Sequence, residues 1–198
     1  MAPKRSLAVI SAPAKAKVLV DPMRREILRL LSGQPMTQNA LAEELGLSNT
    51  SVAHHLKLLL NIGLVHVQRE EKELHGILQK FYETTSLAYF VDTRKLPLDI
   101  QRYFMPTNLE RVRGILVALG VTRGEANPVP TKDLEEFARV LESTIAEVAP
   151  KYEKLKASDR EEVIGRVQFE ALRYLIANPD LTPESVKKLL HGALRRAS

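Results

Sequence analysis

The stretch from Leu41 to Val65 constrains the fold of this chain more than any other. Leu41 and Leu45 lie at helical spacing, and Gly46 follows at the position where a helix end favours a left-handed residue. Ser48 is then placed to cap a second helix. The stretch therefore predicts two short helices joined by a tight turn, which is a helix-turn-helix.

The second of these helices has one apolar and one mostly polar side. Because Val52, Leu56, Leu59 and Leu60 form an apolar stripe, the residues left facing outward are Asn49, Thr50, Ser51, Ala53, His54 and Lys57. Such short donors and acceptors with one cation suit the base edges and phosphates of a major groove. A small helical subdomain with a hydrated polar face would show the same pattern, so the flanking sequence has to decide.

The flanking sequence indicates a wing. Gly63 ends the second helix, Val65 and Val67 alternate, a polar segment runs to Gly76, and residues 77–84 suit a second strand. The informative pieces are Asp21 to Leu28, Ser51 to Leu56, Gly63 to Val65 and Lys80 to Thr85. In these pieces the chain resembles the ArsR-like group of winged-helix transcription regulators, in the broad sense that includes archaeal regulators without metal sensing.

The resemblance covers residues 20–85 and implies which side chains contact duplex DNA. It places His55 at the DNA end of the second helix, where the ring either donates to a phosphate or props the helix against its neighbour. His54 is the better placed of the two to read a base. The full set of expected DNA-binding residues is Thr37, Gln38, Ser48, Asn49, Thr50, Ser51, His54, His55, Lys57, Arg69, Lys72 and Lys80.

The charge of the expected wing departs from the family pattern. Wings that touch DNA are usually basic, but this one carries Glu70, Glu71 and Glu73 among its cations. Contact with phosphates would fall to Arg69, Lys72 and Lys80. Repulsion can instead hold the acidic tip away from the duplex.

Composition bounds the class of protein. A chain of 198 residues, 44% of them apolar, can bury a core and hold one or two domains. It has no cysteine, which excludes disulfides and thiolate metal sites. No apolar run reaches the roughly 18 residues that a membrane helix needs. We expect a cytoplasmic protein without a membrane partner.

Residues 1–19 form a basic segment before the winged-helix domain, which we expect over residues 20–91. The formal net charge is +5, and the segment carries Lys4, Arg5, Lys15 and Lys17 but no acid. Such an arm can track phosphates or a minor groove. A frayed terminus explains the composition equally well.

The remainder of the chain is expected to be a linker and then helices. Residues 92–108 are linker-like because Pro97 and Pro106 stand among charges, yet four apolar side chains there should dock on the fold: Ile100, Tyr103, Phe104 and Met105. Residues 109–198 show helical spacing throughout. Their helix caps are expected at Thr131, at Ser158 paired with Glu161, and at Thr182.

One expected helix of this C-terminal region carries an apolar seam. Leu134, Leu141, Ile145 and Val148 keep a three-four alternation that can pair with a second copy of the chain, although a bundle within one chain gives the same periodicity. Effector binding is a second open role, against a purely structural bundle. It rests on the aromatic positions Tyr103, Phe104, Phe137, Tyr152, Phe169 and Tyr174.

Catalysis and metal binding are poorly supported. The chain has no phosphate loop, paired-glycine fingerprint, cysteine nucleophile or His-Glu-x-x-His motif. Metal sensors of the family use cysteines or clustered histidines. Here His54 and His55 point in different directions from one helix, while His66 and His75 lack a third ligand. We expect no enzymatic activity, cofactor or metal.

These observations predict a mainly α fold with a small β-hairpin wing, in which a winged helix-turn-helix domain precedes a helical C-terminal region. The resemblance implies a homodimeric transcription regulator that binds double-stranded DNA sequence-specifically. Two alternatives stay open: a winged helix used as a protein-interaction module in a larger complex, and a nonspecific chromatin-like DNA binder.

Overall fold

The computed structural model describes residues 4–72, 78–118, 130–188 and 190. Its elements in chain order are β1 (Arg5–Ile10), α1 (Pro13–Leu19), α2 (Pro22–Gly33), β2 (Met36–Thr37), α3 (Gln38–Leu45), α4 (Asn49–Asn61), β3 (Val65–Lys72), β4 (Leu78–Thr84), β5 (Ser86–Val91), η1 (Thr93–Lys95), α5 (Leu98–Ala118), α6 (Thr131–Val148), η2 (Ala149–Tyr152), α7 (Arg160–Ala177) and η3 (Pro179–Leu181). Residues 184–188 are also helical. Among the described helices, none is long and apolar enough to span a membrane.

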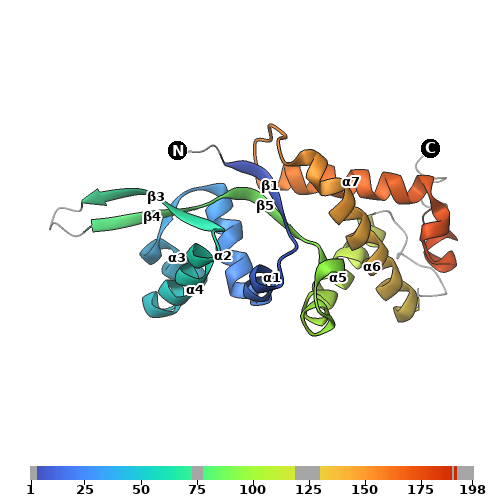
Figure 1. The fold of residues 1–198 in the computed structure, drawn as a ribbon, viewed down its shortest axis with the longest axis horizontal. Helices are drawn as coiled ribbons and strands as arrows, with labels where there is room; N and C mark the ends of the chain where they lie inside the picture. Colours follow the sequence, from blue (N-terminus) through green and yellow to red (C-terminus); the bar gives the residue numbers. More distant parts are fainter. Residues whose placement is uncertain (1–3, 73–77, 119–129, 189, 191–198) are drawn as a thin grey trace.

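Two lobes meet at a central pair of strands (Figure 1). Helices α1 to α4 and the β3–β4 wing form the N-terminal lobe, and α5 to α7 lie on the other side of β1 and β5. The strand pair is parallel, with Arg5 opposite Ser86 and Ile10 opposite Val91. Leu7 and Phe90 belong to the core of the C-terminal lobe, whereas Ile10 belongs to that of the N-terminal lobe. The pair is therefore a wall shared by both cores.

The basic N-terminal segment is folded from Arg5 onward, so neither an arm nor a frayed end describes residues 5–19. Between its charges, Ser6, Leu7 and Ile10 are buried in β1, and Ala16 and Leu19 are buried in α1. The segment is also anchored by Lys4. Its Nζ donates to the Ser32 carbonyl at 2.9 Å and to the Glu83 carboxylate at 3.3 Å. The expectation rested on the charges of the segment, whereas its few buried apolar residues decide how it folds.

The N-terminal lobe confirms the expected winged helix. Asp21 caps α2, where its carboxylate accepts from the Met23 amide at 2.8 Å, and Pro22 takes the first helical position. The wing is antiparallel, with Val65 opposite Thr84, and β2 pairs with the other edge of β4. The helices enclose an apolar core that includes Ile27, Leu31, Leu41, Val52, Leu56 and Leu59.

Residues 98–108, expected within a linker, are the first half of the long helix α5 (Figure 1). Pro106 lies inside this helix and removes one backbone donor. Burial offsets that loss, because Ile100 and Phe104 pack into the N-terminal core while Val112 and Leu116 pack into the C-terminal core. Ile100 and Phe104 therefore dock as expected, but Tyr103 stays half exposed.

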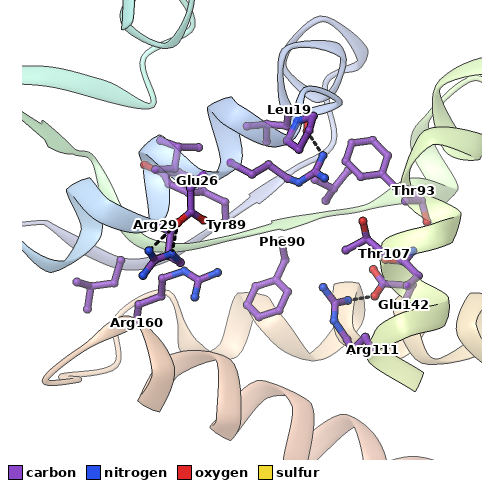
Figure 2. A pocket seen from close by; sticks show the side chains of 17 residues that line it. Leu19, Glu26, Arg29, Tyr89, Phe90, Thr93, Thr107, Arg111, Glu142 and Arg160 are labelled. Carbon is purple, nitrogen blue, oxygen red and sulfur yellow. Dashed lines mark hydrogen bonds and ion pairs between the residues drawn. The ribbon is translucent and has the colours of Figure 1, made fainter. Parts of the chain in front are cut away.

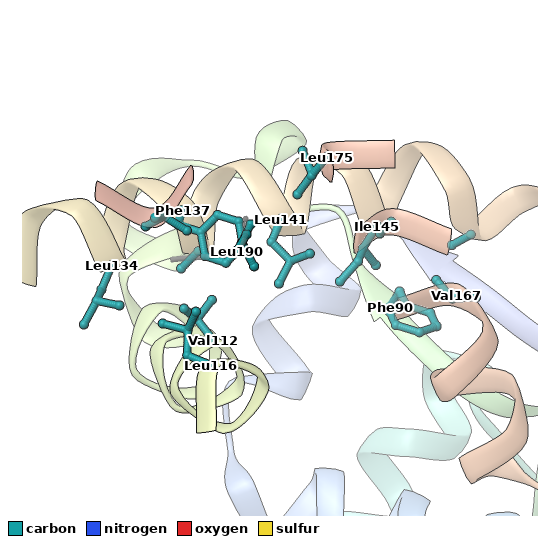
Figure 3. Packing of buried hydrophobic residues seen from close by; sticks show 14 of the residues in the cluster. Phe90, Val112, Leu116, Leu134, Phe137, Leu141, Ile145, Val167, Leu175 and Leu190 are labelled. Carbon is teal, nitrogen blue, oxygen red and sulfur yellow. The ribbon is translucent and has the colours of Figure 1, made fainter. Parts of the chain in front are cut away.

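The apolar seam of α6 lies inside one chain (Figure 3). Leu134, Leu141, Ile145 and Val148 are at most 8% exposed, and the first three belong to the core formed with α5, α7 and β5. The bundle within one chain is thus what the seam forms, and the seam offers no surface to a second copy. The periodicity of the seam indicated that these side chains are buried, but not whether the same chain or a second copy covers them.

Two of the expected helix caps in this lobe are displaced by one residue. Pro130, rather than Thr131, precedes α6, and no side chain caps that end. Asp159 caps α7 by accepting from the Glu162 amide at 2.8 Å. Ser158 still takes part, because its amide donates to the Glu162 carboxylate at 2.9 Å. The acid at position 159 is the stronger acceptor and takes the cap.

Candidate nucleic-acid interface

The turn between α3 and α4 holds the second helix of the motif in place. Gly46 adopts a φ of 62°, a left-handed conformation that favours glycine. The Leu47 amide then donates to the Ala42 carbonyl at 2.9 Å, and Ser48 Oγ accepts from the Ser51 amide at 3.2 Å. The left-handed glycine and the Ser48 cap were predicted from the sequence and are confirmed.

One side of α4 is fastened to the core and the other is open. Val52, Leu56 and Leu59 are at most 2% exposed. On the outer side, Asn49, Thr50, His54 and Lys57 are exposed, and Ser51 and Ala53 are half-buried. Helix α4 contains neither Asp nor Glu. A rigid helix thus presents donors, acceptors and one cation with no carboxylate of its own beside them.

Three of the expected contact residues also fix the backbone of the motif. Thr37 is 8% exposed, and its hydroxyl caps α3 by accepting from the Ala40 amide at 3.2 Å. Gln38 Nε2 donates to the Asn49 carbonyl at 3.0 Å, which ties the start of α3 to the start of α4. Ser48 caps α4 yet remains exposed. Thr37 consequently positions α3, whereas Gln38 and Ser48 lie at the edge of the open face.

His55 faces the start of α2 rather than the open side of α4. Its side chain is 12% exposed, and Nδ1 lies 3.9 Å from the Asp21 carboxylate that caps α2. Burial lowers the pKa of His55, an effect partly offset by the negative charge of Asp21. The ring therefore lies between α4 and the start of α2, a position that favours packing over a phosphate contact, the two roles that the resemblance left open. His54 is exposed and meets the His55 ring only edge-on, at 6.0 Å between centroids.

Two of the cations of the wing form ion pairs with glutamates of the wing. Arg69 pairs with Glu71 at 2.6 Å and lies over the Phe81 ring, 3.8 Å from its centroid. Lys80 pairs with Glu70 at 3.5 Å. Lys72 is exposed, and among the described residues it has no ion-pair partner. Glu73 and His75 lie outside the described residues, so the expected tip and the His66–His75 pairing are not part of this description.

Sequence reasoning missed Tyr89, which fixes the end of α4. Its hydroxyl donates to the Leu64 carbonyl at 2.8 Å and accepts from the Ser86 amide at 3.0 Å. Burial raises the pKa of this phenol, which keeps the donating proton in place. The signal in the sequence was a tyrosine next to Phe90 within an apolar run, which does not show where the tyrosine hydroxyl points.

The described residues show no group of side chains suited to hold a metal ion. Three or more His, Asp or Glu residues that could hold one ion do not come together in the described ranges. His66 Nε2 lies 3.8 Å from Glu83, which in turn accepts from Lys4. That cluster contains one acid between two basic groups and is a charge network.

Comparisons with known proteins point to the same part of the chain. Residues 19–68 match the family described as a helix-turn-helix domain. The chain is 39% identical over 54 residues to the transcriptional repressor SdpR of Bacillus subtilis, a match that covers 27% of this chain and 60% of the relative. It is 32% identical over 83 residues to the HTH-type transcriptional regulator NmtR of Mycobacterium tuberculosis, covering 42% of this chain and 67% of the relative.

The family match at residues 19–68 takes in α2, α3, α4 and the first residues of β3, and it ends before the C-terminal lobe. The capped turn, the acid-free face of α4 and the antiparallel wing agree with the names of both relatives. The chain belongs to the ArsR-like winged helix-turn-helix family of transcription regulators.

Proposed function

We propose that this protein binds double-stranded DNA in a sequence-specific manner, as a homodimer, and thereby regulates transcription. The open face of α4 carries this proposal. That helix is held by a buried stripe, capped at its start, and free of acidic side chains. Helices of this type enter the major groove and read base edges from their first turns.

The roles of the individual residues follow from their positions on that face. Asn49, Thr50 and His54 are exposed near the start of α4 and can donate to or accept from base edges. Ser51 lies beside them and is half-buried. Lys57 is exposed further along the helix, where a cation would meet a phosphate. Gln38 and Ser48 extend the contact at its edge.

The salt dependence of DNA binding tests this function. Fluorescence anisotropy with random duplex DNA, repeated over a range of salt concentrations, should show log affinity falling linearly with log salt, because phosphate contacts release counterions. A flat response would favour the protein-interaction module instead. A steep response without any preferred sequence in a selection from random duplexes would favour the nonspecific binder.

The homodimer is proposed because one short helix reads few base pairs. Two copies reading half-sites about 34 to 36 Å apart are the usual solution. Since the α6 seam is buried within one chain, another surface has to provide the interface. The described residues leave apolar side chains exposed elsewhere, among them Leu98 at the start of α5, 80% exposed, and Phe169 on α7, 69% exposed.

Sedimentation of the full chain with three variants tests the dimer and its surface. Leu98→Glu and Phe169→Glu change exposed side chains, so a variant that weakens the dimer should still fold. Leu141→Asp places an unpaired charge in the core and should unfold the C-terminal lobe. If the full chain sediments only as a monomer with and without DNA, the dimer is excluded.

A further inference from the structure

A cavity of about 410 Å³ lies between the two lobes (Figure 2). Its wall is formed by α2 of the N-terminal lobe, by β5, by α5 and α6, and by the start of α7. Small-molecule sites in proteins commonly measure about 300 to 1,000 Å³ and often lie between domains. The cavity therefore has the size and the place of a ligand site.

The charges on the wall are unbalanced. Four arginines stand against two glutamates: Arg25, Arg29, Arg111 and Arg160 against Glu26 and Glu142. Arg29 pairs with Glu26 at 2.6 Å, and Arg111 pairs with Glu142. Figure 2 shows Arg160 reaching toward the Glu26–Arg29 pair, with Arg111 and Glu142 on the other side of the cavity. Among the described residues, Arg25 and Arg160 form no ion pair with a glutamate of the wall.

Arg25 is the informative one. Its Nη1 donates to the carbonyls of Leu19 and Val20, at 2.8 Å each, and no carboxylate of the described residues lies within ion-pair distance. Burial lowers the pKa of this guanidinium, and the negative charge of Asp21 offsets part of that effect. Within the described residues, Arg160 forms its ion pair with Glu161 at 3.1 Å, outside the wall, and its charge also acts on Glu26.

The rest of the wall is mostly apolar. Leu28 comes from α2, Phe104 from α5, and β5 contributes Leu87, Phe90 and Val91. Phe90 projects into the middle of the view in Figure 2, between the two groups of arginines. Such a wall favours the apolar body of a ligand, while guanidinium groups bind carboxylates and phosphates through charge-assisted hydrogen bonds.

The cavity also touches the support of α4. Tyr89 lines it, and the hydroxyl of that residue holds the Leu64 carbonyl just after α4 ends. Arg25 and Arg29 belong to α2, whose cap Asp21 lies beside His55 of α4. An occupant would thus contact α2 and Tyr89 on one side and α5, α6 and α7 on the other.

We propose that this cavity binds an amphipathic organic anion, an apolar chain or ring that ends in a carboxylate or a phosphate, and that its binding changes the affinity of α4 for DNA. The binding step stands independently of the proposed function, whereas the regulatory step rests on it. If the ligand changes DNA affinity, DNA changes ligand affinity by the same factor.

Calorimetric titration of the full chain tests the binding step with octanoate, octyl phosphate and octanol. Either anion should bind at one site per chain, and octanol should bind at least about tenfold more weakly, because it lacks the charge that the arginines recognise. The anion that binds with the higher affinity shows whether the cavity prefers a carboxylate or a phosphate head group. Equal binding of octanol, or no binding of either anion, overturns the proposal.

Variants separate the cavity from adsorption to the surface. Arg25→Gln and Arg160→Gln should each weaken anion binding, and Arg25→Lys should restore part of it. Thr107→Trp, at an exposed position that lines the cavity, should block all ligands. Arg166→Gln is the matched control, because it removes an exposed α7 arginine outside the cavity. Unchanged anion binding in Arg160→Gln and Thr107→Trp overturns the proposal even if Arg25→Gln fails to fold.

DNA anisotropy with and without the bound anion tests the regulatory step. We expect the affinity for duplex DNA to shift in the wild type and to stay constant in Thr107→Trp. Anion binding without any shift overturns regulation and leaves the binding site. A chain that binds the anion but no DNA refutes the proposed function, and the regulatory step with it.

Discussion

Helix α4 and the wing carry basic side chains in opposite ways. The outer face of α4 has Lys57 and His54 without a carboxylate on the same helix. In the wing, Arg69 is engaged by Glu71 and Lys80 by Glu70. Both surfaces are exposed and polar, so their difference lies in pairing rather than in residue type.

This difference separates a surface open to a partner from one in which Arg69 and Lys80, two of its three expected contact cations, are already paired. A phosphate approaching α4 meets Lys57, which has no ion-pair partner among the described residues, on a helix whose apolar side is buried. A phosphate approaching Arg69 or Lys80 has to displace a glutamate first. Exposed ion pairs of this kind contribute roughly 0 to 1 kcal/mol each to stability. We therefore expect α4 to dominate affinity and the wing to contribute only when its acids are removed.

The largest effect should come from breaking the support of α4. Leu56→Ala removes a side chain that is 2% exposed, and we expect the free energy of unfolding to fall by about 2 to 5 kcal/mol, together with DNA binding. Phe81→Ala, at a half-buried wing position, should cost less. Urea unfolding of both variants measures the difference, and equal losses would contradict the comparison.

Base reading should be lost next. His54→Ala is expected to reduce discrimination at one base pair of each half-site by about 1 to 3 kcal/mol while leaving stability unchanged, because the ring is exposed. Arg69→Ala, its counterpart in the wing, should weaken all sequences equally and only slightly. Binding to a selected site and to its single-base variants measures this. An equal loss by His54→Ala on every sequence would remove its reading role.

Salt dependence should distinguish the cations themselves. Lys57→Ala should reduce the slope of log affinity against log salt by about 0.9, the value of one phosphate contact. Lys80→Ala should change it less, because Glu70 already neutralises that lysine.

The reverse substitution sharpens the same point. Glu70→Gln frees Lys80, and we expect it to increase both the slope and the affinity. If Lys80→Ala and Lys57→Ala change the slope equally, the pairing of the wing has no influence on its contact with DNA.

The smallest effect should appear on acidification. The pKa of His55 is lowered in the folded chain, so the unfolded chain takes up a proton first as pH falls below the usual histidine value of 6.5. The stability that the neutral ring allows is then lost as pH falls toward the folded pKa. Asp21, Arg24 and His54 are the charged or titratable neighbours that set this balance.

Unfolding by urea at about pH 7.5 and about pH 5.5 measures this effect. The loss of stability between the two should be smaller in His55→Gln than in the wild type, and smaller than the loss caused by Leu56→Ala. An identical loss in both chains would show that His55 does not contribute.

The helix-turn-helix could be predicted from the sequence because its rules are local. Gly46 meets a left-handed position, and Ser48 and Asp21 meet cap positions, each within a few residues of the group that it serves. The open face of α4 follows from the same periodicity. What failed depended on distant partners: β1 is a strand only because β5 lies beside it.

The candidate contact residues divide along the same line. That α4 exposes Asn49, Thr50 and His54 was predictable, since a helix has two sides and one was apolar. That Lys80 is paired depended on strand register, which sets Glu70 opposite Lys80, whereas Arg69 pairs with Glu71 of its own strand. The cavity between the lobes had no local signal, because Arg25 and Arg160 are far apart in the sequence and meet only in the folded chain.

The shared strand wall has a consequence for how this chain comes into being. Strand β1 emerges from synthesis early, but its partner β5 follows only after the helix-turn-helix and the wing. Until then Leu7 lacks the core residues that bury it, all of which follow in the chain from Ala88 onward, and the core of the C-terminal lobe lacks Phe90. Contacts between residues so far apart in sequence form slowly. The strand pair thus forms only once Val91 is available, and cutting the chain after Val91 would uncover the apolar face of β1 and β5 in one piece and the helices that pack on it in the other.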